Sequence, residues 1–226
     1  MESISILQML QVSDSLFPIG AFTLSNGLET FVLDKSLKTN EDLEEYIDCF
    51  LSVLPYNELG VMMLAYKNAD NKQYLQKLDE YFTALKGPME VRIGNRKLCN
   101  RFLKIWDEIK DYTHICNYRA MIKEKKCKGI HAVVVGLYAK DINLDIYTAA
   151  AVYAYSLVSA IVTNAVKTVP LSQLAGQKIL NSVLGRIQEQ AKLADGITME
   201  DLGVGAPIMD IAAMNHECLY SRLYMS

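Results

Sequence analysis

The sequence lacks the short motifs by which phosphate-binding and hydrolytic enzymes are usually recognised. No GxxxxGK[ST] loop, GxSxG turn or HExxH pattern occurs in its 226 residues. Gly203 and Gly205 lack the third glycine and the preceding strand of a dinucleotide-binding loop, so they predict only a turn. We therefore predict no catalytic residue and no bound cofactor. A helical enzyme with a buried pocket remains a minor alternative.

Cysteine is sparse, and its spacing excludes the common redox and zinc motifs. The five cysteines are an odd number and include no CxxC pair: Cys49, Cys99, Cys116, Cys127 and Cys218. No secretory signal with a basic start and an apolar core precedes them. Scattered free thiols are typical of reducing compartments, so we expect a cytoplasmic protein.

Positive charge is not in excess. The chain has 23 Lys and Arg against 26 Asp and Glu, which gives a formal net charge of −3 and argues against nucleic acid as a partner. Acidic residues are concentrated in 34–58 and basic residues in 110–128. This distribution indicates either a dipolar molecule or two ordinary solvated helix faces.

One stretch is long enough to cross a membrane. No charged residue occurs from Ile146 to Val166, and about 20 apolar residues suffice for a spanning helix. The stretch also contains four hydroxyl side chains besides those of its tyrosines, and Asn164, so it is only mildly hydrophobic. We expect a central helix that other helices bury, and no membrane association.

Apolar residues recur at helical spacing along the whole chain, without sustained strand-like alternation. The run Val133–Val135 would also fit a strand, but its neighbours favour a buried helix. No linker marks a domain boundary. We predict an all-α, single-domain bundle of roughly ten helices around a central buried helix, spanning residues 1–226.

Capping and helix-breaking residues predict several boundaries. Thr39 or Asn40 should cap a helix that begins at Glu41 and ends at Pro55. Thr198 with Asp201 resembles a capping box. Further helices are expected at 58–69, 72–86, 88–109, 171–193 and 208–223.

Four side chains form the most metal-like pattern: His114, Cys116, Cys127 and His131. A spacing of four residues on a helix brings two soft donors to one face, as metal sites require. The lysines between the two pairs would repel a cation, so we favour buried cysteines with a hydrogen-bonded core histidine over a metal site.

Two segments are apolar without serving an obvious core helix. Residues 13–29 mix apolar, hydroxyl, proline and glycine residues without helical period, which predicts an ordered loop leading into a helix. Residues 207–226 end on Leu219, Tyr220, Leu223, Tyr224 and Met225, although chain ends are usually polar. We expect this terminus to dock on the core or on a partner.

These two segments carry a resemblance to the UreF family of urease accessory proteins. Its opening pattern is matched by Ser15, Pro18, Ile19, Gly20, Phe22, Thr23, Ser25, Gly27, Leu28 and Glu29. Its closing pattern is matched by Pro207, Asp210, Ile211, Met214, His216, Glu217, Leu219, Arg222, Leu223, Tyr224 and Ser226. Blocks at 94–98, 131–136 and 167–173 extend the resemblance over essentially the whole chain.

The resemblance implies a homodimeric chaperone scaffold for nickel insertion. It would bridge a UreD-type (UreH-type) protein and a UreG-type GTPase, gate GTP-dependent nickel delivery, and act on apo-urease through that complex. The expected partner-binding residues are Pro18, Gly20, Phe22, Ser25, Glu29, Lys167, His216, Glu217, Arg222, Leu223 and Tyr224. Glu29 and Lys167 are expected as exposed charges of the GTPase face. The alternative is a nickel-binding metallochaperone or conduit that uses the four metal-like residues.

Overall fold

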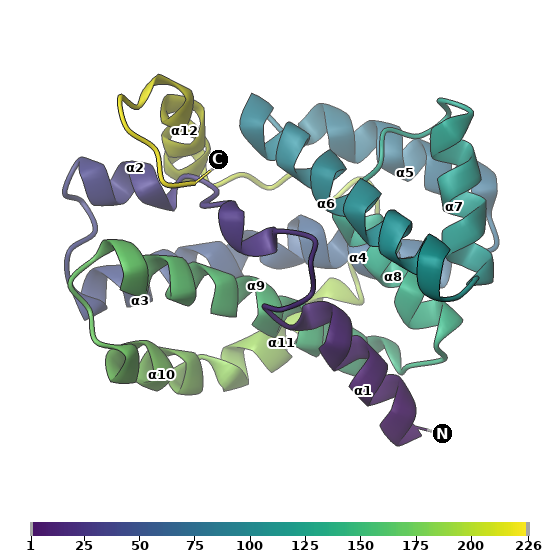
Figure 1. The fold of residues 1–226 in the computed structure, drawn as a ribbon, viewed down its shortest axis with the longest axis horizontal. Coiled ribbons are helices and arrows are strands. Elements are labelled where there is room, and N and C mark those ends of the chain that lie inside the picture. Colours follow the sequence, from purple (N-terminus) through teal and green to yellow (C-terminus); the bar gives the residue numbers. More distant parts are fainter. Residues whose placement is uncertain (1, 225–226) are drawn as a thin grey trace.

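The computed structural model describes residues 2–224, and within them the chain is helical, with no strand (Figure 1). The α-helices are α1 (Glu2–Ser13), α2 (Leu28–Leu33), α3 (Asn40–Val53), α4 (Glu58–Lys67), α5 (Lys72–Leu85), α6 (Met89–Ile109), α7 (Thr113–Lys123), α8 (His131–Asp141), α9 (Ile146–Thr168), α10 (Gln173–Ser182), α11 (Leu184–Ala194) and α12 (Pro207–Asn215). The predicted all-α fold is confirmed. Met225 and Ser226, which belong to the apolar terminus and the closing pattern, lie outside the described residues.

The centre of the bundle is α8. Every residue from His131 to Ala139 is buried, and α4 packs along the helix. The loop before α8 is fixed by the buried Asp79, whose carboxylate accepts hydrogen bonds from the backbone amides of Lys128 (2.6 Å) and Gly129 (3.1 Å). The valine run is therefore helical, as the sequence favoured, because α8 is covered on all sides and needs no polar face.

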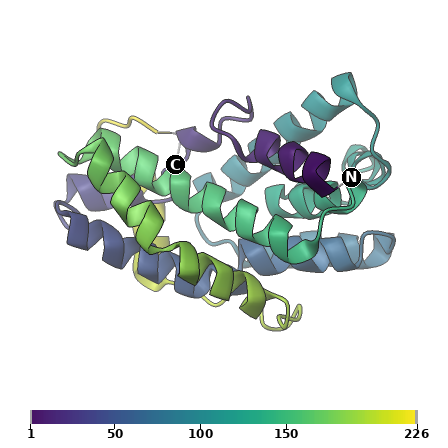
Figure 2. The ribbon, with the colours of Figure 1, turned by 90° about the horizontal axis from the view of Figure 1, so that it is seen from below.

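Helix α9 is covered by other helices over much of its surface, but less completely than its composition predicted. Although α1, α4, α8, α10 and α11 pack against it (Figures 1 and 2), Tyr155 remains 40% exposed on its outer side. Two helical stretches, 40–67 and 146–168, are long and apolar enough to cross a membrane. The first is broken by a 3-10 turn at Leu54–Tyr56, and both pack within the bundle.

The predicted cap of α3 is present. The Thr39 hydroxyl accepts a hydrogen bond from the Asp42 amide (3.2 Å), and the Asp42 carboxylate accepts one from the Thr39 amide (2.9 Å). This reciprocal pair satisfies two amides at the helix start. Asp201 accepts two similar hydrogen bonds from Thr198, but a turn follows there rather than a helix.

Two predicted helices differ from the structure. The helix expected at 171–193 is divided at Val183 into α10 and α11, and this turn lets both helices pack on α9. The helix expected at 208–223 ends at Asn215, and a 3-10 turn at His216–Cys218 leads into a non-helical segment. Contacts of that segment with α2 and α6 give the reason for the early end.

Candidate functional site

The end of the chain docks on the start of α2. Gly27, which precedes α2, has a φ of +92° and lies so close to α12 that a Cβ atom there would be 2.8 Å from the Ala213 nitrogen. The Thr30 hydroxyl donates to the Ala212 carbonyl at 2.8 Å. Only glycine combines this backbone conformation with so close an approach. Gly27 of the opening pattern therefore allows α12 to pack against α2.

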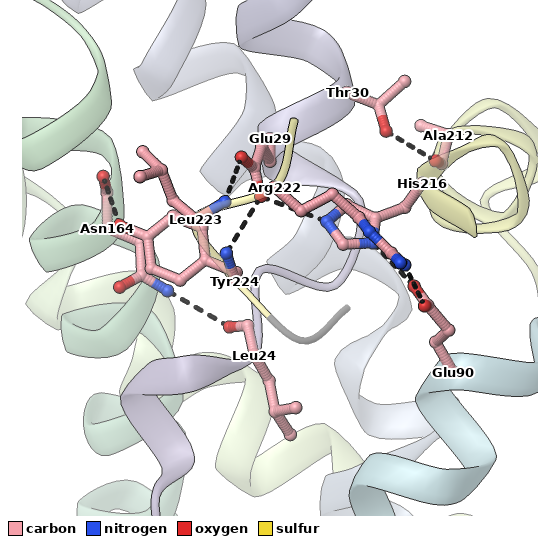
Figure 3. A network of polar contacts seen from close by, with 10 residues as sticks. All are labelled: Leu24, Glu29, Thr30, Glu90, Asn164, Ala212, His216, Arg222, Leu223 and Tyr224. Carbon is pink, nitrogen blue, oxygen red and sulfur yellow. Dashed lines mark hydrogen bonds and ion pairs between the residues drawn. The ribbon is translucent and has the colours of Figure 1, made fainter. Parts of the chain in front are cut away.

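Glu29, on the first turn of α2, is the centre of the contact (Figure 3). Its side chain is buried, and its carboxylate accepts hydrogen bonds from the backbone amides of Leu223 (2.8 Å) and Tyr224 (3.2 Å). The same carboxylate lies 3.1 Å from Nε2 of His216. A buried carboxylate requires such donors, because desolvation would otherwise make its charge very costly.

His216 connects Glu29 to a second carboxylate. Its ring is fully buried, and its Nδ1 lies 2.6 Å from Oε2 of Glu90, on the first turn of α6. The guanidinium of Arg222 reaches the other oxygen of Glu90 at 2.8 Å. The amino end of α6 adds a favourable field for the Glu90 charge. We call Glu29, Glu90, His216 and Arg222 the terminal network.

Tyr224 and Asn164 extend these contacts to α9 (Figure 3). The Tyr224 hydroxyl donates to the Asn164 carbonyl (3.4 Å), and the Asn164 side chain donates to the Leu24 carbonyl (3.1 Å). Burial raises the pKa of the Tyr224 hydroxyl, which stays a neutral donor. The opening loop, α9 and the chain end are therefore held together in one place.

The structure brings part of the predicted partner-binding set into this site. Glu29, His216, Arg222, Leu223 and Tyr224 meet there, whereas Ser25 is buried nearby and Phe22 and Gly20 are half-buried. Pro18, Lys167 and Glu217 are exposed.

The expectation that Glu29 is an exposed charge is wrong. Only 3% of Glu29 is accessible, and its oxygens are occupied by the chain's own donors. Sequence reasoning also missed Glu90. Its position just after Pro88 shows only that it begins a helix, and no local pattern pairs it with His216, 126 residues away.

The four metal-like residues do not come together. His114 lies between Asp141 (2.7 Å) and Asp70 (3.2 Å) at the end of α8, whereas His131 begins α8, so about 15 Å of helix separates the two histidines. Cys116 contacts Asp111 and Arg119. Burial raises the pKa of the Cys127 thiol to about 12. Within residues 2–224, no group of three or more His, Cys, Asp or Glu is arranged to hold a metal ion.

Fold and site together define an all-helical bundle whose residues 216–224 are held on α2 and α6 by an ionic network centred on the buried Glu29 and His216. Comparison with known proteins narrows this class to one family. The UreF family profile matches residues 37–184. Three relatives named "Urease accessory protein UreF" are similar over nearly their full length. That of Actinobacillus pleuropneumoniae serotype 5b (strain L20) is 35% identical, with 96% of this chain and 97% of the relative covered. That of Haemophilus influenzae (strain PittEE) is 36% identical, with 96% and 94% covered. That of Bacillus sp. (strain TB-90) is 33% identical, with 98% and 99% covered.

The chain belongs to the UreF family of urease accessory proteins. Membership confirms the resemblance carried by the opening and closing patterns and gives the protein a role in urease maturation. The family name describes an accessory protein rather than a catalyst.

Proposed function

We propose that the protein is a cytoplasmic, non-enzymatic scaffold for nickel insertion into apo-urease. It bridges a UreD-type (UreH-type) protein and a UreG-type GTPase, and it gates GTP-dependent nickel delivery without binding the nucleotide itself. One observation carries the proposal: the terminal network fixes the backbone of the chain end while apolar side chains of that end point outward.

The proposed surface for the UreD-type protein consists of α12 and the docked segment after it. Its exposed apolar side chains are Ile208 (72%), Ile211 (56%), Met214 (44%), Tyr220 (107%) and Leu223 (75%). A group of large apolar side chains left in water is typical of a protein-binding surface. Because His216 and Glu29 are buried beneath it, they position this surface rather than contact a partner.

The proposed GTPase face is the opening loop with Pro18 and Phe22, together with Lys167 near the end of α9. Pro18 and Lys167 are exposed, and the loop is held by the Arg101 guanidinium, which donates to the Ile19 carbonyl (2.8 Å). A rigid loop and an exposed charge are suited to fix the register of a partner.

The test is a pull-down with purified UreD-type and UreG-type proteins. We expect Leu223→Asp to weaken capture of the UreD-type protein at least about tenfold, because a charge would enter an apolar contact. Leu184→Asp on α11 is the matched control, since Leu184 is 47% exposed and lies outside the proposed surface. A chain ending at Tyr220 should also lose the complex. Undiminished capture by that truncated chain would contradict the proposed surface.

A further inference from the structure

Both ring nitrogens of His216 face carboxylates. Nδ1 lies 2.6 Å from Glu90 and Nε2 lies 3.1 Å from Glu29 (Figure 3). An ionised carboxylate only accepts hydrogen bonds, whereas a neutral imidazole has one donor nitrogen and one acceptor nitrogen. The two contacts are both satisfied only when His216 carries two ring protons and is an imidazolium.

With both carboxylates ionised, the charges around His216 balance only in that state. Glu29 faces the ring from α2 and Glu90 faces it from α6, while Arg222, from the chain end, approaches Glu90. Two carboxylates are thus matched by one imidazolium and one guanidinium. The hydroxyl of Tyr224 points to the Asn164 carbonyl and takes no part in the balance.

Removing one ring proton would leave a lone pair of His216 opposite a carboxylate oxygen. The ring is 0% exposed and Glu29 is 3% exposed, so little water can reach the contact to compensate. A buried charge that loses its partner destabilises the arrangement strongly. Undocking of the chain end relieves this, because it returns both carboxylates to solvent.

We propose that residues 216–224 form a proton-dependent clamp, in which doubly protonated His216 fastens the chain end to Glu29 and Glu90 and loss of one ring proton releases it. The clamp regulates the partner surface described above, and only this regulatory consequence rests on the proposed function. The docking itself is a property of the isolated chain.

The response of the clamp to pH follows from the protonation state of His216. As the pH rises, His216 loses a proton and the clamp opens. The clamp is therefore closed while both ring nitrogens carry protons and open after one proton is lost.

Nuclear magnetic resonance of the isolated full-length chain tests the clamp without any partner. We expect both ring nitrogens of His216 to be protonated under conditions where the amides of Leu223 and Tyr224 are protected from hydrogen exchange. After correction for the intrinsic effect of pH, exchange of these two amides should accelerate roughly tenfold to hundredfold as the ring loses a proton.

Two variants separate the proton dependence from simple loss of contacts. In Glu90→Gln the new amide can donate to a neutral ring, so docking should persist when His216 is singly protonated. Arg222→Gln is the control, because it removes an ion pair of Glu90 but keeps both carboxylates that face His216. In Arg222→Gln, protection of the Leu223 and Tyr224 amides from hydrogen exchange should still depend on the second ring proton of His216.

A singly protonated His216 in the docked chain would overturn the clamp, as would amide protection that does not change when the ring titrates. Unchanged pH dependence in Glu90→Gln would overturn it too. None of these results depends on partner binding. Failure of the clamp and failure of the proposed partner surface are therefore distinguishable.

Discussion

At the residue scale, two buried histidines are placed in opposite surroundings. His131 lies beside Phe102, with ring centroids 6.2 Å apart, and its Nδ1 is 3.4 Å from the Tyr153 hydroxyl. Burial lowers the pKa of His131 to about 4, so it is neutral at pH 7. His216 is equally buried but lies between two carboxylates. The neighbours, and not burial alone, determine whether a core histidine is charged.

Acid should destabilise the fold through His131. Its folded-state pKa, about 4, is below the ordinary histidine value of 6.5, so its stabilising contribution is complete above pH 6.5 and is lost as the pH falls towards 4. The loss should approach about 3 kcal/mol. In His131→Gln this part of the pH dependence should disappear, as measured by urea unfolding at a series of pH values. A variant as acid-sensitive as the parent chain would contradict this assignment.

Sequence reasoning reached much of the terminal network but not its arrangement. Glu29, His216 and Arg222 were identified from the opening and closing patterns, and docking of the apolar terminus was expected. Glu90 was missed because its partners are distant in sequence. The burial of Glu29 was missed because a lone glutamate beside a loop is usually solvated.

At the element scale, the most extensive contact between two helices of the described residues is that of α4 with α8. A Cβ atom at Gly136 would clash with the Met62 carbonyl of α4. The two helices approach so closely because α8 has no side chain at Gly136, where the backbone of Met62 and Tyr66 lies against it. Gly136 therefore determines the distance between the two most buried helices of the bundle.

Gly136→Ala should force α4 and α8 apart and destabilise the fold by about 2–3 kcal/mol. Gly185→Ala is the matched control on α11, where an added Cβ meets nothing within 4 Å. There alanine should stabilise by up to about 1 kcal/mol, through its better helix propensity. Urea unfolding followed by circular dichroism compares the two. Equal changes in the free energy of unfolding in the two variants would show that the close approach of α4 and α8 does not restrict residue 136 to glycine.

The helices were largely predictable because apolar spacing and caps are local signals. Which helix lies at the centre was not, since composition alone does not reveal whether neighbours cover one side of α9 or all of it. The end of α12 at Asn215 could not be predicted from the sequence either. The amides of Leu223 and Tyr224 leave the helical pattern to reach Glu29, which is 194 and 195 residues away in sequence.

At the scale of the whole molecule, the family resemblance implies a homodimer, and we propose the outer side of α9 as its contact. Tyr155 is 40% exposed, and Ala151, Val152 and Ser159, all half-buried, lie on the same side of the helix. These four residues are uncharged, and three are small or β-branched, which suits close approach of a second copy about a two-fold axis.

Tyr155→Asp should convert the dimer into a monomer, because two charges would meet at the symmetric contact. Light scattering after size-exclusion chromatography measures the mass. Tyr81→Asp on α5 is the control, since Tyr81 is exposed to a similar extent (39%) on a different helix. A parent chain that is monomeric at micromolar concentration would contradict the dimer, and a dimeric Tyr155→Asp would exclude α9 as its contact.

The contact between His216 and Glu29 joins residues 187 positions apart. A ribosome adding about 5–20 residues per second needs roughly 10–40 s to travel that distance, during which Glu29 has no imidazole to meet. The earlier helices can fold meanwhile, but the docked surface cannot form until the last segment has been made. If the proposed function holds, a chain that lacks residues 216–224 therefore offers a partner no docked surface.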